Sequence, residues 1–416
     1  MRMITHELAH HNEAALRSAR FSRRVLTVMF LIGLIMTAAA CSRDAGTDGN
    51  SSAESADQSS PCALTTDTSA WVAFEKLADR VGSGTNVSKE ELDAFGDLPT
   101  VTLWRNSLGA PIPSANRVGN WLESTFWDEL GREGNQKKGA DRAIFTRSYR
   151  YSLDNRDRIN KRLAELTGPR KCDIDEMARF WVESDLLPAT LDIHFLPAKT
   201  EIRIFEGSLL VDTGVVGAGN SDQVIRHMAA LLYRKYQTIP GPNPIDLEGE
   251  EAVAHCFRVM MNEGITGWIE QTVAFEFDSS HPVLYKVKII PEDFFLKAQQ
   301  AIDIMNGHLG PMLDDEATMV EKGQNFAIHL AGMNALSHTG FSMSAVIAAH
   351  LGPERLRDAG RSIPAFLAAY QEAALANPVP APVPGAPNVE LFNTVPPLDP
   401  EIFTKLETML TRVFPD

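Results

Sequence analysis

The segment SDQVIRHMAALLYRKYQ, residues 221–237, carries the clearest helical pattern of the chain. Its apolar residues recur at helical spacing and form a single stripe, which consists of Val224, Ile225, Met228, Leu231, Leu232 and Tyr236. His227 lies on the flank of this stripe. The pattern predicts an amphipathic helix that packs its apolar face against a core and holds a histidine at the edge of that face.

Short β-segments precede this helix. LDIHFLP, EIRIFEG and SLLVDTGVV, between residues 190 and 216, are rich in β-branched residues and alternate between polar and apolar positions. They predict a small antiparallel sheet. The glycine-rich stretch GVVGAGNSD, residues 214–222, predicts a flexible turn that ends with Asn220 or Ser221 as the N-cap of the helix.

Helical patterns dominate the rest of the chain, so we expect an α+β fold that is mainly helical. The apolar spacing predicts helices within residues 66–187 and over 248–275, 291–308, 341–356 and 363–376. The predicted organisation is a signal peptide (1–40), a disordered tether (41–61), a helical N-terminal region (62–187), a central domain (188–376), a proline-rich extended connector (377–397) and a C-terminal helix (398–416).

The composition restricts the class of protein. The chain has 416 residues, of which 44% are hydrophobic, and this is enough apolar material for a sizeable core. Its formal net charge is −15. Because binding to nucleic acid requires clustered lysines and arginines, we expect no nucleic-acid partner.

The N-terminus has the features of an export signal. Arginines at 17, 20, 23 and 24 precede the apolar run VLTVMFLIGLIMTAAA, which is too short for a comfortable membrane span and ends in small residues. These residues lead directly into Cys41 and resemble the lipobox of bacterial lipoproteins, in which the cysteine is diacylated and becomes the mature N-terminus. The alternatives are simple cleavage after Ala-x-Ala with an incidental cysteine, or a weak twin-arginine signal at SRRVL.

Lipidation of Cys41 would place the protein in the bacterial cell envelope, with the membrane as a partner. In a Gram-negative cell, Ser42 after the cysteine favours the outer membrane, facing the periplasm. Residues 42–61 are rich in Ser, Gly and Asp and contain no aromatic residue, so they are expected to form a flexible tether.

Three further cysteines are distributed along the expected folded body. Cys62 begins this body and Cys172 follows a Gly-Pro loop, so a disulfide between them is plausible in an oxidising compartment. Cys256 lies in an apolar helical pattern, which is typical of a buried free thiol rather than of a reactive one.

The sequence HMAAL, residues 227–231, has the spacing of the zinc-binding helix H-E-x-x-H. Met228 stands where that motif has its general base, and Leu231 stands where it has its second histidine. Thioether sulfur is a weak ligand for zinc and leucine is not a ligand, so this helix supplies one zinc ligand at most. Without further information, His227 is more typical of a hydrogen-bonded surface histidine.

The chain resembles a family of bacterial zinc-dependent peptidases of the gluzincin type. The resemblance rests on LPATLDIHF, VIRHMAALLYRKY, MNEGITGWIE and the segment HTGFSMSAVIAAHLGPERLRDAGRSIPAFLAAYQEAA, and it covers roughly residues 60–376 as a pattern of elements. It implies a zincin-like core in residues 188–376, with the small sheet packed on the helices that formed the metal site.

The resemblance also assigns the site residues. His227 matches the first histidine ligand and Glu263 the glutamate ligand on the next helix, and His338 resembles a histidine that faces the substrate. Glu263 also has a structural reading, because a helix that continues through Gly264 would hold it as an ordinary mid-helix glutamate.

Two functions remain open at this level. In the first, the zincin-like protein has lost catalysis, needs no cofactor and binds or scaffolds a peptide or an envelope protein. In the second, it is an active zinc metallopeptidase with a rearranged ligand set, in which His338 or His255 joins His227 and Glu263. A purely structural role in the envelope is a plainer variant of the first.

Overall fold

The computed structural model describes residues 62–85, 87–107, 150–197, 202–271, 278, 280, 291–376, 381–383, 386–391 and 396–415. The predicted signal peptide, Cys41 and the tether lie outside these residues. All described residues belong to one compact unit, Ser60–Asp416.

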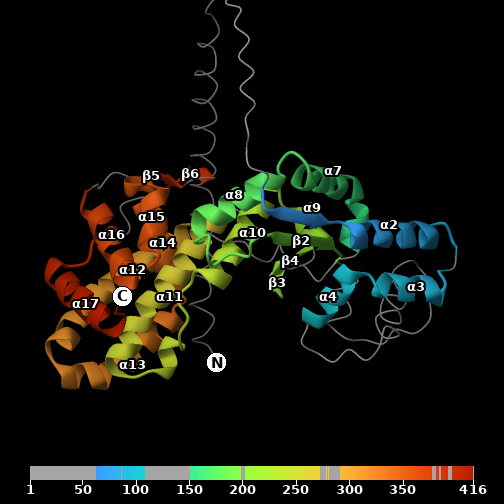
Figure 1. The fold of residues 1–416 in the computed structure, drawn as a ribbon. Helices are drawn as coiled ribbons and strands as arrows, with labels where there is room; N and C mark the ends of the chain where they lie inside the picture. The colour runs from blue at the N-terminus through green and yellow to red at the C-terminus, as the bar shows by residue number, and fades with distance from the viewer. Residues whose placement is uncertain are drawn as a thin grey trace, which may run out of the picture. The chain divides into compact units, whose positions relative to one another are not determined.

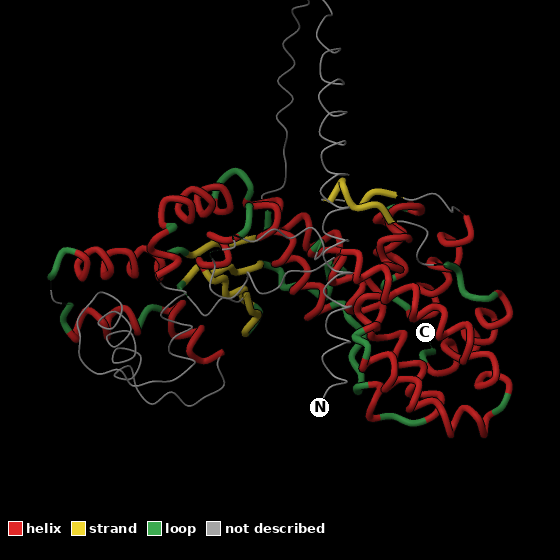
Figure 2. Tube along the Cα trace, turned by 180° about the vertical axis from the view of Figure 1, so that it is seen from behind, coloured by secondary structure: helices red, strands yellow, loops and turns green. Residues whose placement is uncertain are grey.

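The fold is mainly helical with a small four-stranded sheet, which agrees with the expected α+β class. The sheet contains β1 (Leu64–Asp67), β2 (Leu191–Leu196), β3 (Ile202–Phe205) and β4 (Ser208–Asp212) in the order β1-β2-β4-β3. Figure 2 shows these strands beside one another, with helices around them.

The expectation of an antiparallel sheet is wrong, because two of its three strand pairs are parallel. β2 pairs in parallel with both β1 and β4, and only β3 and β4 are antiparallel. The β3–β4 hairpin turns through Glu206 and Gly207, which both have positive φ, as tight two-residue hairpins require. This hairpin reverses the chain between β3 and β4, and β4 pairs in parallel with β2. The alternation of side chains along a strand does not show whether the strand pairs in parallel or antiparallel.

The N-terminal part of the unit contains α2 (Ser69–Gly82), α3 (Lys89–Gly96), α4 (Pro99–Ser107), α7 (Arg156–Thr167) and α8 (Lys171–Trp181). A disulfide joins Cys62 to Cys172, the two cysteines paired in the sequence analysis, with their Cα atoms 5.4 Å apart. It fastens Cys62, two residues before β1, to the start of α8. The helical prediction for this region missed β1, whose four residues are too few to show a period.

The chain then enters α9 (Thr213–Ala218) and α10 (Ser221–Tyr236). Residues 213–218 form a helix, not the end of a strand and a flexible turn. Asn220 is the N-cap of α10, and its side chain accepts from the Gln223 amide while the Gln223 side chain accepts from the Asn220 amide. This reciprocal capping box explains why α10 begins at Ser221.

A helical bundle forms the C-terminal part of the unit (Figure 1). It contains α11 (Gly249–Glu270), α12 (Pro291–Asp314), α13 (Glu316–Gly332), α14 (Ala335–Leu351), α15 (Pro353–Ala359), α16 (Ile363–Ala376) and α17 (Pro400–Val413), with the short 3₁₀ helix η1 (Pro244–Asp246) before α11. The sequence analysis did not predict α13. Within the predicted extended connector, β5 (Ala381–Val383) and β6 (Ala386–Leu391) pair as antiparallel strands.

The core of this bundle depends on a close crossing of α11 and α14 at Gly264 and Gly340. A Cβ built at Gly264 would lie 2.8 Å from Gly340 Cα, and one built at Gly340 would lie 2.8 Å from Met260 Cα. Real Cβ atoms essentially never approach so closely, so both positions require glycine. α11 runs unbroken through Gly264, so Glu263 is a mid-helix residue.

Candidate functional site

Helix α10 holds most of its apolar stripe in the core. Met228 is fully buried, and Leu231 is half-buried against the same core. The residues at the general-base and second-histidine positions of the zinc motif thus act as packing residues. His227, beside them, is 26% exposed at its side chain, so it lies at the edge of the core as its position on the stripe predicts.

His227 pairs with Glu270, the last residue of α11, through its Nδ1 atom. Glu263, which the sequence analysis selected as the metal-binding glutamate, instead accepts a hydrogen bond from Arg234 Nη2 at 2.9 Å. Both pairs join α10 to α11. The two glutamates are seven residues apart, or about 10.5 Å along the helix. The glutamate of α11 that contacts His227 is therefore Glu270, and the predicted metal ligand Glu263 contacts Arg234 instead.

The spacing of the two glutamates accounts for these contacts. Seven residues are two helical turns, so Glu263 and Glu270 lie on the same face of α11 and both are available to α10. Which glutamate meets His227 depends on the register of the two packed helices. That register follows from tertiary contacts, among them the Gly264–Gly340 crossing.

The other two candidate histidines have separate environments. His338 is buried within α14, and its Nδ1 contacts the carbonyl oxygen of Asn334 one turn earlier. His255 accepts a hydrogen bond from Arg258 Nε at 2.9 Å and packs against the Phe414 ring. Burial, together with the nearby Arg258 charge, lowers the pKa of His255. In the described ranges, no three His, Cys, Asp or Glu side chains gather closely enough to hold a metal ion.

Cys256 occupies the environment that its apolar pattern predicts. It is a free, buried thiol that donates to the Ala252 carbonyl, and burial raises its pKa to about 12. A thiol with such a pKa stays protonated and is a poor nucleophile.

A polar cluster that the sequence analysis missed lies on one face of the sheet. Asp67, at the end of β1, is the register partner of His194 in β2, and their Oδ2 and Nδ1 atoms are 3.4 Å apart. Thr100, in the first turn of α4, donates to Asp67 and lies 2.9 Å from His194 Nδ1. The signal was the alternation in LDIHFL, which places Asp192 and His194 on the same face.

This cluster fixes the orientation of the imidazole. Since the Thr100 hydroxyl donates to Asp67, its oxygen accepts from His194 Nδ1, so the hydrogen bonds of this cluster engage Nδ1 and not Nε2. Burial raises the pKa of Asp67, but hydrogen bonds from Thr100, Ser69 and His194 outweigh it and the pKa is lowered. An imidazole held by a carboxylate can act as a base or ligand. Thr100 itself is fully buried and is not accessible as a nucleophile.

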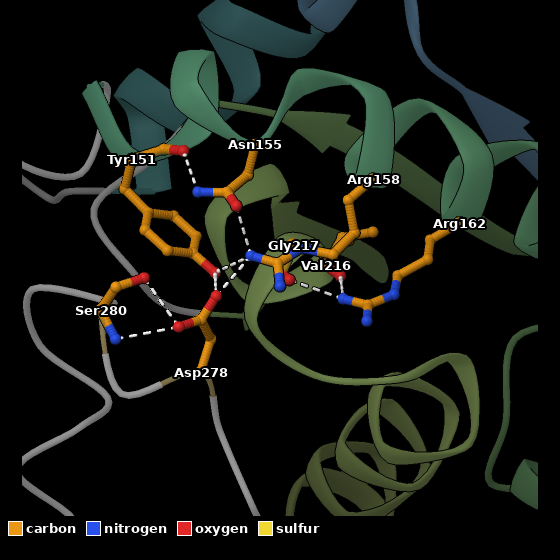
Figure 3. Close-up of polar contacts among 8 residues, drawn as sticks. All are labelled: Tyr151, Asn155, Arg158, Arg162, Val216, Gly217, Asp278 and Ser280. Carbon is orange, nitrogen blue, oxygen red and sulfur yellow. Dashed lines mark hydrogen bonds and ion pairs between the residues drawn. The ribbon is translucent and has the colours of Figure 1, made fainter.

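A second polar cluster fastens the residue Asp278 to α7 and to the residues just before it (Figure 3). The Asp278 carboxylate accepts hydrogen bonds from Arg158 Nη2, from the Tyr151 hydroxyl at 3.1 Å, and from the backbone amide and hydroxyl of Ser280 at 2.9 and 2.7 Å. Although burial raises the pKa of Asp278, these hydrogen bonds hold it well below its usual value.

Arg162 completes this second cluster. Its Nη1 atom donates to the carbonyl oxygens of Val216 and Gly217 at 2.8 and 2.6 Å, and the Asp278 amide donates to the Ala218 carbonyl at 3.1 Å. These three carbonyls belong to the last turn of α9 and have no partner further along that helix. The cluster is therefore explained as a cap that holds α9 against α7.

A groove of about 650 Å³ lies between α12, α13, α17 and the first turn of α11. Met312, Met319 and Met409 line it, one from each of three helices, and each is at most 6% exposed. Glu250 and Glu316 line the same groove, as do Lys405 and Arg412. Thr404 and Thr408 line it as well, so polar and apolar side chains contribute to this groove in similar measure.

Comparison of the chain with protein-family models, with curated proteins and with solved structures finds no match. In the part of the chain that the structure describes, no helix has the length and apolar content needed to cross a membrane.

Proposed function

We propose that the protein is a lipid-anchored protein of the bacterial cell envelope with a gluzincin-like core, which has lost zinc-dependent hydrolysis and serves in binding or scaffolding. One observation carries the proposal. His227 and Glu270 meet across α10 and α11, as a histidine and a glutamate of a gluzincin site would, while buried Met228 and half-buried Leu231 occupy the remaining positions.

The chemistry of these residues supports the loss of catalysis. A catalytic zinc ion uses three protein ligands and an open position for water, and the His227–Glu270 pair supplies two. Met228 cannot accept a proton, and a positioned general base contributes roughly 10²- to 10⁴-fold to such reactions. The order of parts, a sheet followed by a histidine helix and a glutamate helix, agrees with the proposed gluzincin-like core.

Zinc content tests the loss of the site. The full chain, purified in detergent and dialysed against micromolar zinc, is expected to hold well below one zinc ion per molecule. It should show no chelator-sensitive cleavage of a peptide library. One zinc per chain together with chelator-sensitive cleavage would instead establish an active metallopeptidase with a rearranged ligand set. In that case His227→Ala and Glu270→Gln should abolish the cleavage.

The proposed location rests on the N-terminal sequence and on the disulfide. Cys62 follows the predicted tether directly and is bonded to Cys172, a linkage that persists in oxidising compartments. Cells grown with labelled palmitate should label the wild-type chain and not the Cys41→Ala variant, which should also leave the membrane fraction. The Cys256→Ala variant is the matched control and should keep the label. Labelling that survives in Cys41→Ala would refute the lipid anchor.

A further inference from the structure

The two halves of the Cys62–Cys172 disulfide differ in their access to solvent. Cys172 is exposed, whereas Cys62 is half-buried. Cys172 is the second residue of α8, and Cys62 lies two residues before β1. A disulfide that is enclosed in a core is closed to thiols, but an exposed one can be attacked while the chain stays folded. The proposed function makes no use of this difference.

We infer that this disulfide is a redox-sensitive fastening, which external thiols open in the folded protein by attack on Cys172. The attacking thiolate forms a mixed disulfide with Cys172 Sγ, the bond between the two Sγ atoms breaks, and Cys62 leaves as a thiolate that takes up a proton. A second thiolate then attacks the mixed disulfide and releases the Cys172 thiolate. Two electrons thus pass to the protein from two thiols, or from one dithiol, which end as a disulfide.

The position of Cys172 on α8 favours its thiolate. The first turn of a helix presents backbone N–H groups without intrahelical partners, and the positive end of the helix dipole lies there. Arg170, the N-cap residue, adds no side-chain cap to this turn, and Lys171 carries a positive charge next to Cys172. The negative charge of Asp173 in the same turn is paired with Arg170 at 2.7 Å. Cysteines in such positions form the thiolate readily and exchange readily.

Opening of the disulfide acts on the strand that begins the folded unit. β1 lies at the edge of the sheet, where it pairs with β2. It keeps noncovalent contacts without the disulfide, because Leu64 is buried, Asp67 accepts from Thr100, and the Leu191 amide donates to the Ala63 carbonyl at 2.9 Å. The covalent link to α8 is lost while the sheet persists. Thiols would therefore control whether the residues before β1 are fastened to α8.

The alternative explanation is a purely structural disulfide, which a reductant reaches only when the chain unfolds. The test uses the full chain with Cys41→Ala and Cys256→Ala, so that its remaining cysteines are those of the disulfide. It is incubated with excess glutathione at neutral pH, quenched with acid and mapped by mass spectrometry. We expect glutathione on Cys172 and a free thiol on Cys62, at a rate that does not change with urea below the unfolding transition.

Single-cysteine variants measure the contribution of the helix. In the same background, Cys62→Ser leaves Cys172 free and Cys172→Ser leaves Cys62 free. We expect iodoacetamide to alkylate Cys172 at least tenfold faster than Cys62. Lys171→Glu should slow the reaction of Cys172 about threefold, because it places a negative charge beside the thiolate. Lys322→Glu is the matched control, since Lys322 is exposed on α13, and it should leave the rate unchanged.

Several results would overturn the inference. These are a reduction that requires unfolding concentrations of urea, glutathione on Cys62 rather than on Cys172, equal alkylation rates of the two free cysteines, or equal effects of Lys171→Glu and Lys322→Glu. The glutathione mapping is carried out on the chain with its disulfide intact, so its outcome does not depend on the folding of the single-cysteine variants.

Discussion

Asp278 shows at the scale of single residues how this fold holds a charged group near its interior. Its carboxylate accepts hydrogen bonds from Arg158, Tyr151 and Ser280, and its own amide caps α9. The hydrogen bonds to the carboxylate favour its ionised form, so the pKa of Asp278 is lowered despite burial. Because the carboxylate is ionised more readily in the folded state than in the unfolded one, it stabilises the fold at neutral pH.

Asp278→Asn is therefore expected to destabilise the protein by about 1–3 kcal/mol at pH 7, the usual cost of losing charged hydrogen bonds. A lowered folded-state pKa contributes stability above the unfolded value of about 3.9, and this contribution is lost as the pH falls below it. Urea unfolding at pH 7 and pH 3 should show a difference between wild type and variant that shrinks at the lower pH. A constant difference would contradict this account.

Asp185→Asn provides the control, since Asp185 is exposed and its side chain makes no hydrogen bond to another described residue. It should leave the unfolding free energy nearly unchanged at both values of pH.

Residue-level prediction from the sequence was limited by partners that lie far apart in the chain. The pattern around His227 predicted its place at the edge of an apolar stripe, and the apolar environment of Cys256 was predicted as well. The partner of His227 could not be predicted. Glu263 and Glu270 lie on the same face of α11, and the register of α11 against α10 decides which of them contacts His227. His194 was missed because its partner Asp67 lies 127 residues earlier.

At the scale of elements, the crossing of α11 and α14 determines how the bundle packs. Gly264 and Gly340 let the two helix backbones approach within a distance that no side chain permits. This close approach fixes how α11 lies against α14.

Gly340→Ala should destabilise the protein by about 1–3 kcal/mol, because the added Cβ would overlap the Met260 backbone and force the helices apart. Gly307→Ala in α12 is the matched control, since a Cβ there would meet nothing within 4 Å. That variant should be neutral or stabilising by up to about 1 kcal/mol, as expected for Gly to Ala within a helix. Equal effects of the two substitutions on the urea midpoint would contradict the role given to the crossing.

Helices whose apolar pattern repeats over several turns were predictable from the sequence, whereas strands that are defined by their pairing were not. α10 and α16 lie within one residue of the predicted ranges, because their apolar residues recur over several turns. β1, by contrast, has four residues and exists through its pairing with β2. The parallel direction of β2 and β4 likewise depends on which strand the β3–β4 hairpin joins, which alternation alone leaves open.

At the scale of the whole molecule, the Cys62–Cys172 disulfide closes a loop of 110 residues. It links the beginning of the folded unit to α8, which packs against α10. Any force transmitted through the predicted tether would thus reach the folded unit at a covalently fastened point.

Removing this bond with Cys62→Ser and Cys172→Ser should lower the free energy of unfolding by about 2–5 kcal/mol, since the closed loop is long. Added reductant should lower the urea midpoint of the wild type and leave that of the double variant unchanged. The Cys256→Ala variant should respond to reductant as the wild type does. Insensitivity of the wild type to complete reduction would show that the disulfide does not stabilise the unit.

We propose that α10 and α11 retain the scaffold of a zinc site that lacks its second histidine. Leu231→His would place a second imidazole one turn after His227 on α10, which together with His227 and Glu270 would give a set of three ligands. The most direct test is the number of zinc ions bound per chain. We predict close to one for Leu231→His and for Leu231→His with Glu263→Gln, and well below one for the wild type, for Leu231→Asn and for Leu231→His with Glu270→Gln. A Leu231→His chain that folds and gains no zinc would contradict the claim.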